Sequence, residues 1–217
     1  MSRLLKEISI LKMSDEMFID ISDDNIKKIS VLFFGPPDSA FYHGVFAFDI
    51  TIPDDYPFSP PKVIFLTGGV VGGRMHPNLY QDGKVCLSIL NTWGKNEWSP
   101  LLTIEKLIIT IKALLDNNPL AHEPSFQNQQ SKNYAVYSSY YSLKSILDMY
   151  LFFKENRQDS PFGDIVKDYF LKHREEIIHI LSSLSQDHNG QVYKTIHHNS
   201  KLFFDDLKSK MEQYKGK

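Results

Sequence analysis

The hydrophobic residues of this chain change their spacing along the sequence, and each spacing predicts a different element. Leu4, Leu5, Ile8 and Leu11 recur every three or four positions, with charged residues between them. Such spacing is typical of one buried face of an amphipathic helix. We therefore expect a short helix over residues 2–12.

From residue 17 the hydrophobic spacing falls to two, which predicts β-strands. The clearest example is Gly44–Ile52, in which Phe46, Phe48 and Ile50 alternate with small or polar residues. Short connections join the candidates, so we expect an antiparallel meander with one buried face. The four predicted strands cover residues 17–22, 29–34, 44–52 and 62–66.

Residues 67–100 interrupt this regularity with glycines and prolines and show no sustained period. Such a long irregular stretch is usually functional or disordered. Helical spacing returns after Thr103, a suitable N-cap residue, and continues to Asn117–Pro119. Further helices are expected over residues 127–153, over 160–185 with Pro161 at its first position, and over 200–214.

These elements predict an α+β fold with an N-terminal helix, a four-stranded antiparallel meander, a long loop and several helices. We expect a core domain over residues 1–126. A helical C-terminal extension over residues 127–217 would pack on this core or follow it.

Composition limits the partners and the compartment. The chain has 217 residues, of which 42% are hydrophobic and 23% charged, as in ordinary globular proteins. A formal net charge of −2 gives no reason to expect binding to nucleic acid or to a membrane surface. The N-terminus lacks the apolar run of a secretory signal, and one cysteine cannot form an internal disulfide. We expect a cytoplasmic protein, with the nucleus as an alternative location.

Cys86 is the only cysteine, and three interpretations compete for it. Burial as a small apolar residue is the commonest fate of a free cysteine. A metal site is not expected, because one cysteine and scattered histidines lack the spacing of zinc ligands. The third interpretation is a nucleophile, since the stretch MHPNLYQDGKVC at 75–86 places candidate helpers directly before the sulfur.

As a nucleophile, Cys86 suits thiol exchange better than hydrolysis. A cysteine hydrolase needs a histidine to raise the thiolate fraction; His76 and His122 are candidates, but His76 precedes a proline and no protease signature surrounds the sulfur. Exchange with an activated thioester is nearly balanced in energy and needs no strong activation. Asn78, across the turn-prone Gln81–Gly83 from the cysteine, is a candidate amide donor to a tetrahedral oxyanion.

Two other segments carry weaker signals. Gly68–Met75 approaches a phosphate-binding loop but lacks its lysine and its hydroxyl residue, and Pro77 stands where the helix should begin, so no nucleotide site is expected. Pro53–Pro61 contains four prolines. Its residues alone favour a rigid connector over a platform that holds Phe58 exposed for a partner.

Taken in order, the motifs resemble those of the ubiquitin-conjugating enzymes, the middle enzymes of the ubiquitin cascade. The resemblance covers roughly residues 1–126 and depends on the series, since any one motif is weak. The series is GPPDS at 35–39, YHGVF at 42–46, PDDYPFSPPKV at 53–63, HPN at 76–78, GKVCL at 83–87 and WSP at 98–100. The interval from Cys86 to Trp98 is longer than in the family's common form, and this longer segment is similar to that of the Z-type member.

The resemblance implies a reaction. Cys86 would accept ubiquitin, or another ubiquitin-like modifier, as a thioester from an activating enzyme and pass it to a substrate lysine, usually with a ligase. The activating enzyme consumes the ATP, so no cofactor is expected in this chain. Asn78 would donate to the oxyanion, His76 would brace the loop, and Tyr80 would shape the site for the lysine. The alternative is a non-catalytic ubiquitin-binding variant of the fold, although such variants lack the active cysteine.

The chain departs from the family pattern at the acidic positions. Many members carry an aspartate two residues after the cysteine, where this chain has Ser88. In the family, an acidic residue often follows the helix that comes after the WSP motif, which here is the helix expected after Thr103. The nearest residues in this chain are His122 and Glu123. Either residue would help to desolvate or deprotonate the incoming lysine.

The resemblance also implies two surfaces for partner proteins. Phe58, Pro100 and Leu101 correspond to the two loops that contact ligases in this family. Arg3 and Lys6 correspond to the first-helix surface that activating enzymes recognise. With these matches, the interpretation of Phe58 as an exposed contact residue is favoured over the rigid connector.

Overall fold

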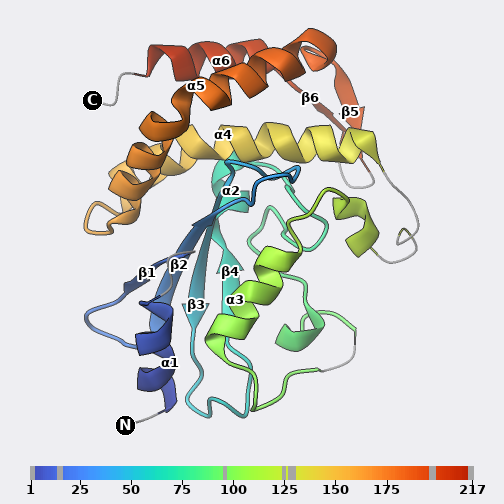
Figure 1. The fold of residues 1–217 in the computed structure, drawn as a ribbon. Helices are drawn as coiled ribbons and strands as arrows, with labels where there is room; N and C mark the ends of the chain where they lie inside the picture. Colours follow the sequence, from blue (N-terminus) through green and yellow to red (C-terminus); the bar gives the residue numbers. More distant parts are fainter. Residues whose placement is uncertain are drawn as a thin grey trace.

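The computed structural model describes residues 3–13, 17–94, 97–123, 126, 131–195 and 199–214. Its first elements are α1 (Arg3–Leu11), β1 (Phe18–Ile21), β2 (Lys28–Phe34), β3 (Val45–Thr51) and β4 (Lys62–Phe65). The four strands form one antiparallel sheet in chain order (Figure 1). The predicted fold class, first helix and meander are therefore confirmed, with each strand end within one residue of its expected position.

The remaining elements follow the sheet in the chain. They are α2 (Leu66–Val71), the 3₁₀ helix η1 (Ser88–Leu90), α3 (Ile104–Ala113), the 3₁₀ helix η2 (Pro119–His122), α4 (Lys132–Asn156), α5 (Phe162–His188), β5 (Val192–Lys194), β6 (Asn199–Lys201) and α6 (Phe204–Gln213). In Figure 1, α3 crosses one face of the sheet, whereas α4 lies across the end of the sheet with α5 and α6 beyond it. None of the helices within the described ranges is long and apolar enough to cross a membrane.

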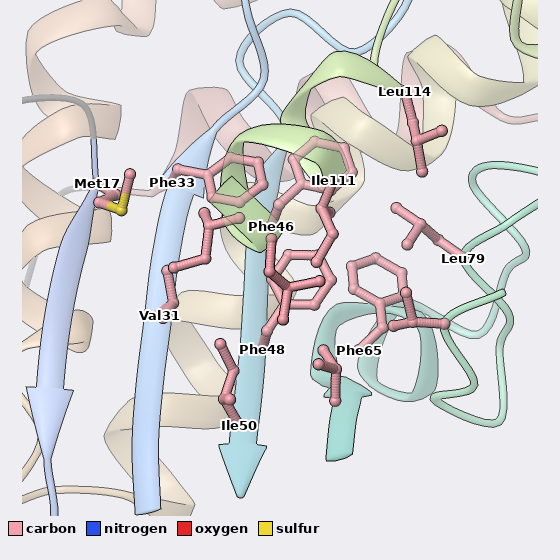
Figure 2. Packing of buried hydrophobic residues seen from close by; sticks show 14 of the residues in the cluster. Met17, Val31, Phe33, Phe46, Phe48, Ile50, Phe65, Leu79, Ile111 and Leu114 are labelled. Carbon is pink, nitrogen blue, oxygen red and sulfur yellow. The ribbon is translucent and has the colours of Figure 1, made fainter. Parts of the chain in front are cut away.

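Aromatic side chains of β2, β3 and β4 form the main core beneath α3. Figure 2 shows the rings of Phe33, Phe46 and Phe48 gathered around Ile111 of that helix. The centroid of the Phe33 ring lies 5.8 Å from that of the Phe46 ring and 5.6 Å from that of the Phe48 ring. Burial of each such side chain contributes roughly 1.5–3 kcal/mol, so this layer is the main attachment of α3 to the sheet.

The sheet is also buried on its second face near α4, and the expectation of a single buried face is wrong there. Phe33 pairs with Phe46 across the strands, whereas their neighbours Leu32 and Ala47 pair on the opposite face. Leu32 and Ala47 are fully buried in a second hydrophobic cluster with α4, α5 and α6. The reason is that α4 contributes an apolar face of its own to this side of the sheet.

An ion pair fastens the end of α4 to the sheet. The Arg157 guanidinium donates to both carboxylate oxygens of Asp49 on β3, at 2.9 and 2.5 Å. Ser30 of β2 donates to the same carboxylate at 2.7 Å. The division at residue 126 remains a prediction, but residues beyond it form part of the packing of the sheet.

Helix α3 begins as the sequence predicts. The Thr103 side chain accepts a hydrogen bond from the Lys106 backbone N–H at 3.2 Å, which satisfies one donor of the first turn. The helix ends at Ala113, before the expected limit at Asn117–Pro119.

The short helix α2 lies inside the stretch expected to be irregular. Its two glycines argue against a helix on propensity, but Gly68 is required by packing. A Cβ at this position would lie 2.5 Å from the Tyr80 carbonyl oxygen. The helix stops at Gly72, whose φ of 70° is the left-handed conformation of a C-cap. Tertiary packing therefore overrides local propensity here.

The C-terminal extension is helical, as expected, but its last part includes a hairpin. Tyr193 of β5 pairs with Ser200 of β6, and Tyr193 is buried. The helix predicted over 200–214 therefore begins later, at Phe204. Pro161 lies at the N-cap of α5 and not at its first helical position. Of the helix expected over 127–153, residues 127–130 lie outside the described residues.

We expect Phe48→Ala to lower the free energy of unfolding by about 3–5 kcal/mol, because the substitution leaves a cavity in the core beneath α3. Phe58→Ala is the matched control, because Phe58 is 75% exposed whereas Phe48 is 1% exposed. The control should change stability by no more than about 0.5 kcal/mol. Urea unfolding followed by circular dichroism measures both, and equal losses would contradict this account of the core.

Candidate active site

Residues 79–85 fold into a narrow hairpin that leads directly into Cys86. Leu79 and Val85 form an antiparallel bridge, and the Tyr80 N–H donates to the Lys84 carbonyl at 2.9 Å. Gly83 makes the turn with a φ of 90°, a conformation that favours glycine. The hairpin brings the residues before Leu79 beside the cysteine.

Asn78 and Cys86 are joined by two reciprocal hydrogen bonds. The Cys86 N–H donates to the Asn78 carbonyl at 2.8 Å, and the Asn78 side-chain amide donates to the Cys86 carbonyl at 2.7 Å. The amide thus contacts the backbone of the cysteine and not its sulfur. The other amide atom, Oδ1, is buried and has no hydrogen-bond partner among the described residues. The amide group therefore uses one N–H on the cysteine backbone, and its oxygen is an acceptor left unused within the described part of the chain.

His76 supports the residue that follows the proline. Its ring is fully buried, and its Nδ1 accepts a hydrogen bond from the Asn78 backbone N–H at 3.0 Å. Burial, reinforced by the neighbouring His122, holds the pKa of His76 well below its ordinary value. An uncharged, buried ring that accepts a backbone N–H fixes the loop and is not placed to take a proton from solvent-exposed groups.

The Cys86 thiol itself is buried, with 4% of the residue exposed. Burial raises the pKa of the thiol, and the Glu123 carboxylate acts in the same direction. Lys84, the Tyr80 hydroxyl and Arg74 act in the opposite direction and lower this pKa. The net result is a thiol that is protonated at neutral pH.

A threonine in the loop after the cysteine holds that loop against the thiol. The Thr92 hydroxyl donates to the Val85 carbonyl at 2.7 Å and accepts from the Leu87 N–H at 2.9 Å. The Thr92 carbonyl lies 3.8 Å from the Cys86 sulfur. The sequence analysis did not identify this residue, although the long interval between Cys86 and Trp98 was a signal that the loop differs.

The same loop supplies a carboxylate that sequence reasoning missed. The Ser88 hydroxyl donates to Glu97 Oε2, and the Glu97 N–H donates to the Ser88 carbonyl at 3.3 Å. Ser88 occupies the position where the resemblance leads us to expect an aspartate. The fold thus places an acidic side chain in contact with that position, from eleven residues after the cysteine.

Tyr80 and Glu123 are linked through Arg74. The Arg74 guanidinium carbon lies 3.6 Å from the centre of the Tyr80 ring, and its Nη2 lies 4.0 Å from Glu123 Oε2. His122 is directed elsewhere: its Nε2 lies 2.9 Å from Asp116 Oδ2. The Glu123 carboxylate contributes to the raised pKa of the Cys86 thiol, whereas the role of either residue toward a lysine remains a prediction.

The exposed residues expected at a ligase surface come from two loops that are braced together. Phe58 and Leu101 are 75% and 85% exposed, and Pro100 is exposed beside them. The Trp98 indole N–H donates to the Pro57 carbonyl at 2.8 Å, which ties the two loops. Two large apolar side chains are therefore presented on a fixed support.

Arg3 is engaged with the same region, whereas Lys6 is exposed. The Arg3 guanidinium donates to Glu7 Oε1 and to the Leu102 carbonyl, both at 2.6 Å, and also to the Pro100 carbonyl. Glu7 is buried and in turn accepts from the Ile104 N–H at 2.9 Å. Arg3 thus braces α1 against the Pro100 loop, and Lys6 is the more accessible of the two cations.

Comparison with known proteins agrees with this arrangement. The family model for ubiquitin-conjugating enzymes matches residues 3–161. A probable ubiquitin-conjugating enzyme protein 17 of Caenorhabditis elegans is 34% identical over 77% of this chain and 24% of its own length. The human ubiquitin-conjugating enzyme E2 Z is 41% identical over 54% of this chain and 34% of its own length. The matched part of the chain thus spans only about a quarter to a third of the length of these two relatives.

A solved structure gives the same answer for the fold. The E2 domain of a Toxoplasma gondii ubiquitin conjugating enzyme is 30% identical and covers 65% of this chain and 95% of its own, with a TM-score of 0.54. The family match extends over more than half of the chain, and the buried Cys86–Asn78 pair lies within it. This chain therefore belongs to the ubiquitin-conjugating enzyme family and resembles its Z-type members.

Proposed function

We propose that this chain is a conjugating transferase that carries ubiquitin, or another ubiquitin-like modifier, as a thioester on Cys86. An activating enzyme would load the thiol, and a substrate lysine, usually presented by a ligase, would receive the modifier. The observation that carries the proposal is the reciprocal hydrogen bonding of Asn78 and Cys86. The alternative is a non-catalytic ubiquitin-binding variant. Such a variant would not need a thiol whose backbone is hydrogen-bonded to an asparagine amide.

The loading step is a thiol exchange. The Cys86 sulfur attacks the thioester carbonyl on the activating enzyme, the new C–S bond forms, and the enzyme's thiolate leaves. The exchange is nearly balanced in energy, so a thiol with a raised pKa is sufficient, although only its thiolate fraction reacts. No cofactor is needed at this site, because the ATP is consumed by the activating enzyme.

The transfer step places negative charge on the thioester oxygen when the lysine attacks. The Asn78 amide would donate to this oxygen, either through its second N–H or by turning from the Cys86 carbonyl toward the new acyl group. The lysine must also lose a proton. Glu123, beside Arg74, and Glu97, beside Ser88, are the candidate acceptors, and the Tyr80 ring would border the path of the lysine.

Access to the thiol requires motion of the loop that carries Thr92, because Cys86 is only 4% exposed. The apolar pair Phe58 and Leu101, with Pro100, would contact the ligase, and Lys6 on α1 would contact the activating enzyme. Such an enzyme would act in the cytoplasm, with the nucleus as the alternative location.

We expect Cys86→Ala to abolish charging. The protein is mixed with activating enzymes, ATP and ubiquitin and run on a non-reducing gel, where the wild type should give a thiol-sensitive adduct. The variant should give none, because the chain has no other cysteine. If no activating enzyme charges the wild type with any modifier, the enzymatic function is wrong and the non-catalytic alternative gains support.

We expect Asn78→Ala to slow discharge to free lysine by about 100-fold, as for the loss of one oxyanion donor. Because Asn78 also supports the Cys86 backbone, the charging rate is the internal control for loop distortion. Charging should be changed far less than discharge. Equal losses in both steps would show that the residue only maintains the loop, and unchanged discharge would remove it from the mechanism.

Tyr80 and Glu123 should shift the pKa of the Cys86 thiol in opposite directions. Alkylation of the sole cysteine by iodoacetamide, measured against pH, should give a pKa above the value of about 8.5 for a free thiol. Tyr80→Phe should raise this pKa further, because the hydroxyl favours the thiolate, whereas Glu123→Gln should lower it. Glu155→Gln, on the exposed side of α4, is the charge control. Shifts of the same sign in both site variants would contradict the assignment.

A further inference from the structure

Three side chains with metal-binding groups converge far from Cys86 in the sequence. His43 lies in the loop between β2 and β3, and His173 and Glu176 lie one turn apart on α5. His43 Nε2 is 3.4 Å from Glu176 Oε2, and His173 Nδ1 is 3.6 Å from the same oxygen. One ligand atom from each residue lies within 4.8 Å of the other two.

His43 is held in this cluster with one nitrogen unused. The residue is fully buried, and its Nε2 has no hydrogen-bond partner within the described ranges, although the Glu176 carboxylate lies close to it. A buried polar atom without a partner destabilises the fold unless a ligand satisfies it. The backbone of His43 has a φ of 64°, which a histidine seldom adopts, so the surrounding structure holds the ring in place at some cost.

Two tyrosines orient the side chains of the cluster from outside. The Tyr169 hydroxyl is 2.9 Å from His43 Nδ1, the nitrogen that faces away from Glu176. The Tyr42 hydroxyl donates to Glu176 Oε1 at 3.2 Å, which leaves Oε2 toward the histidines. Metal sites commonly have this arrangement, in which the second ring nitrogen and the second carboxylate oxygen are held by neighbouring groups.

The orientation of the His43 ring also suits a ligand. With a proton on Nδ1 directed at Tyr169, the lone pair of Nε2 points into the cluster.

We propose that His43, His173 and Glu176 bind a divalent transition-metal ion, with zinc as the first candidate. Two imidazoles and a carboxylate are suitable donors for zinc. With bonds of about 2.0–2.1 Å, the donors of a tetrahedral site lie about 3.3 Å apart, close to the two shorter separations here. A water molecule would fill the fourth position, since His173 and Glu176 are partly open to solvent.

The ion would join two distant parts of the chain. His43 belongs to the loop that enters β3 of the sheet, whereas His173 and Glu176 belong to α5 of the C-terminal extension. An ion that binds only the folded protein stabilises it by mass action. The site would therefore hold the extension against the core, whether or not the chain transfers ubiquitin.

The test uses the untagged full chain, freed of metal with a chelator and then titrated with Zn²⁺ by calorimetry and by thermal unfolding. We expect one equivalent to bind and the unfolding temperature to rise by several degrees. His173→Ala and Glu176→Gln should each weaken Zn²⁺ binding at least about 10-fold and remove most of the temperature shift. These two variants are decisive because both residues lie near the surface, whereas replacement of the buried His43 risks the fold.

His179→Ala and Glu175→Gln are matched controls on the same helix, because both residues are exposed and lie outside the cluster. They should keep wild-type binding. Cys86→Ala should also keep it, which excludes the thiol as the ligand. Co²⁺ should give the visible absorption bands of a four-coordinate site in the wild type and in these controls, but not in His173→Ala. Absence of stoichiometric binding, or full binding by both α5 cluster variants, would overturn the proposal and leave the cluster as an ion pair.

Discussion

The burial of both faces of the four-stranded sheet positions nearly everything else in this protein. On one face, the aromatic side chains of β2 and β3 anchor α3, and this helix fixes the loops that flank it. On the other face, Leu32 and Ala47 pack against α4, which carries the rest of the extension with it. The cysteine segment is attached to the same sheet: α2 directly follows β4, and the 79–85 hairpin contacts β4 through the bridge between Ile64 and Lys84. A close-packed interior transmits strain from one side chain to the next. A substitution in either layer of the sheet would therefore also change the geometry at Cys86.

The surroundings of Cys86 keep its thiol in the less reactive, protonated form. The thiol is buried and protonated, its backbone is paired with Asn78, and the Thr92 loop lies against the sulfur. A hydrolase needs the opposite, a thiolate open to water beside a basic histidine. The neutral His76 serves the loop instead. A carrier of an activated acyl group benefits from such a site, because the difficult bond has already been made elsewhere.

The sequence predicted what depends on local pattern. Alternating residues such as Phe46 and Phe48 located the strands, and Thr103 located the start of α3. Both signals, the hydrophobic period and the helix cap, depend only on residues close together in the chain. Helix α2 was not predicted because its glycines lower helix propensity. Gly68 is needed there because the Tyr80 carbonyl leaves no room for a side chain, and no local pattern reveals this contact. Glu97 was missed for a similar reason: its partner Ser88 is apparent only when the loop is folded. The proposed metal ligands are residues 43, 173 and 176, which are too far apart in the chain for a ligand motif to be recognised in the sequence.

The Asn78 amide is already engaged before any modifier arrives. In the structure one of its two N–H groups donates to the Cys86 carbonyl, and this bond holds the amide, with its second N–H, in one orientation. Within the proposed reaction, the direction of that second donor would therefore depend on the conformation of the cysteine backbone. A lysine or a ligase that rearranges this loop would also reorient the donor. The rate at which a charged enzyme loses its modifier would then be set by the loop and not by the amide alone.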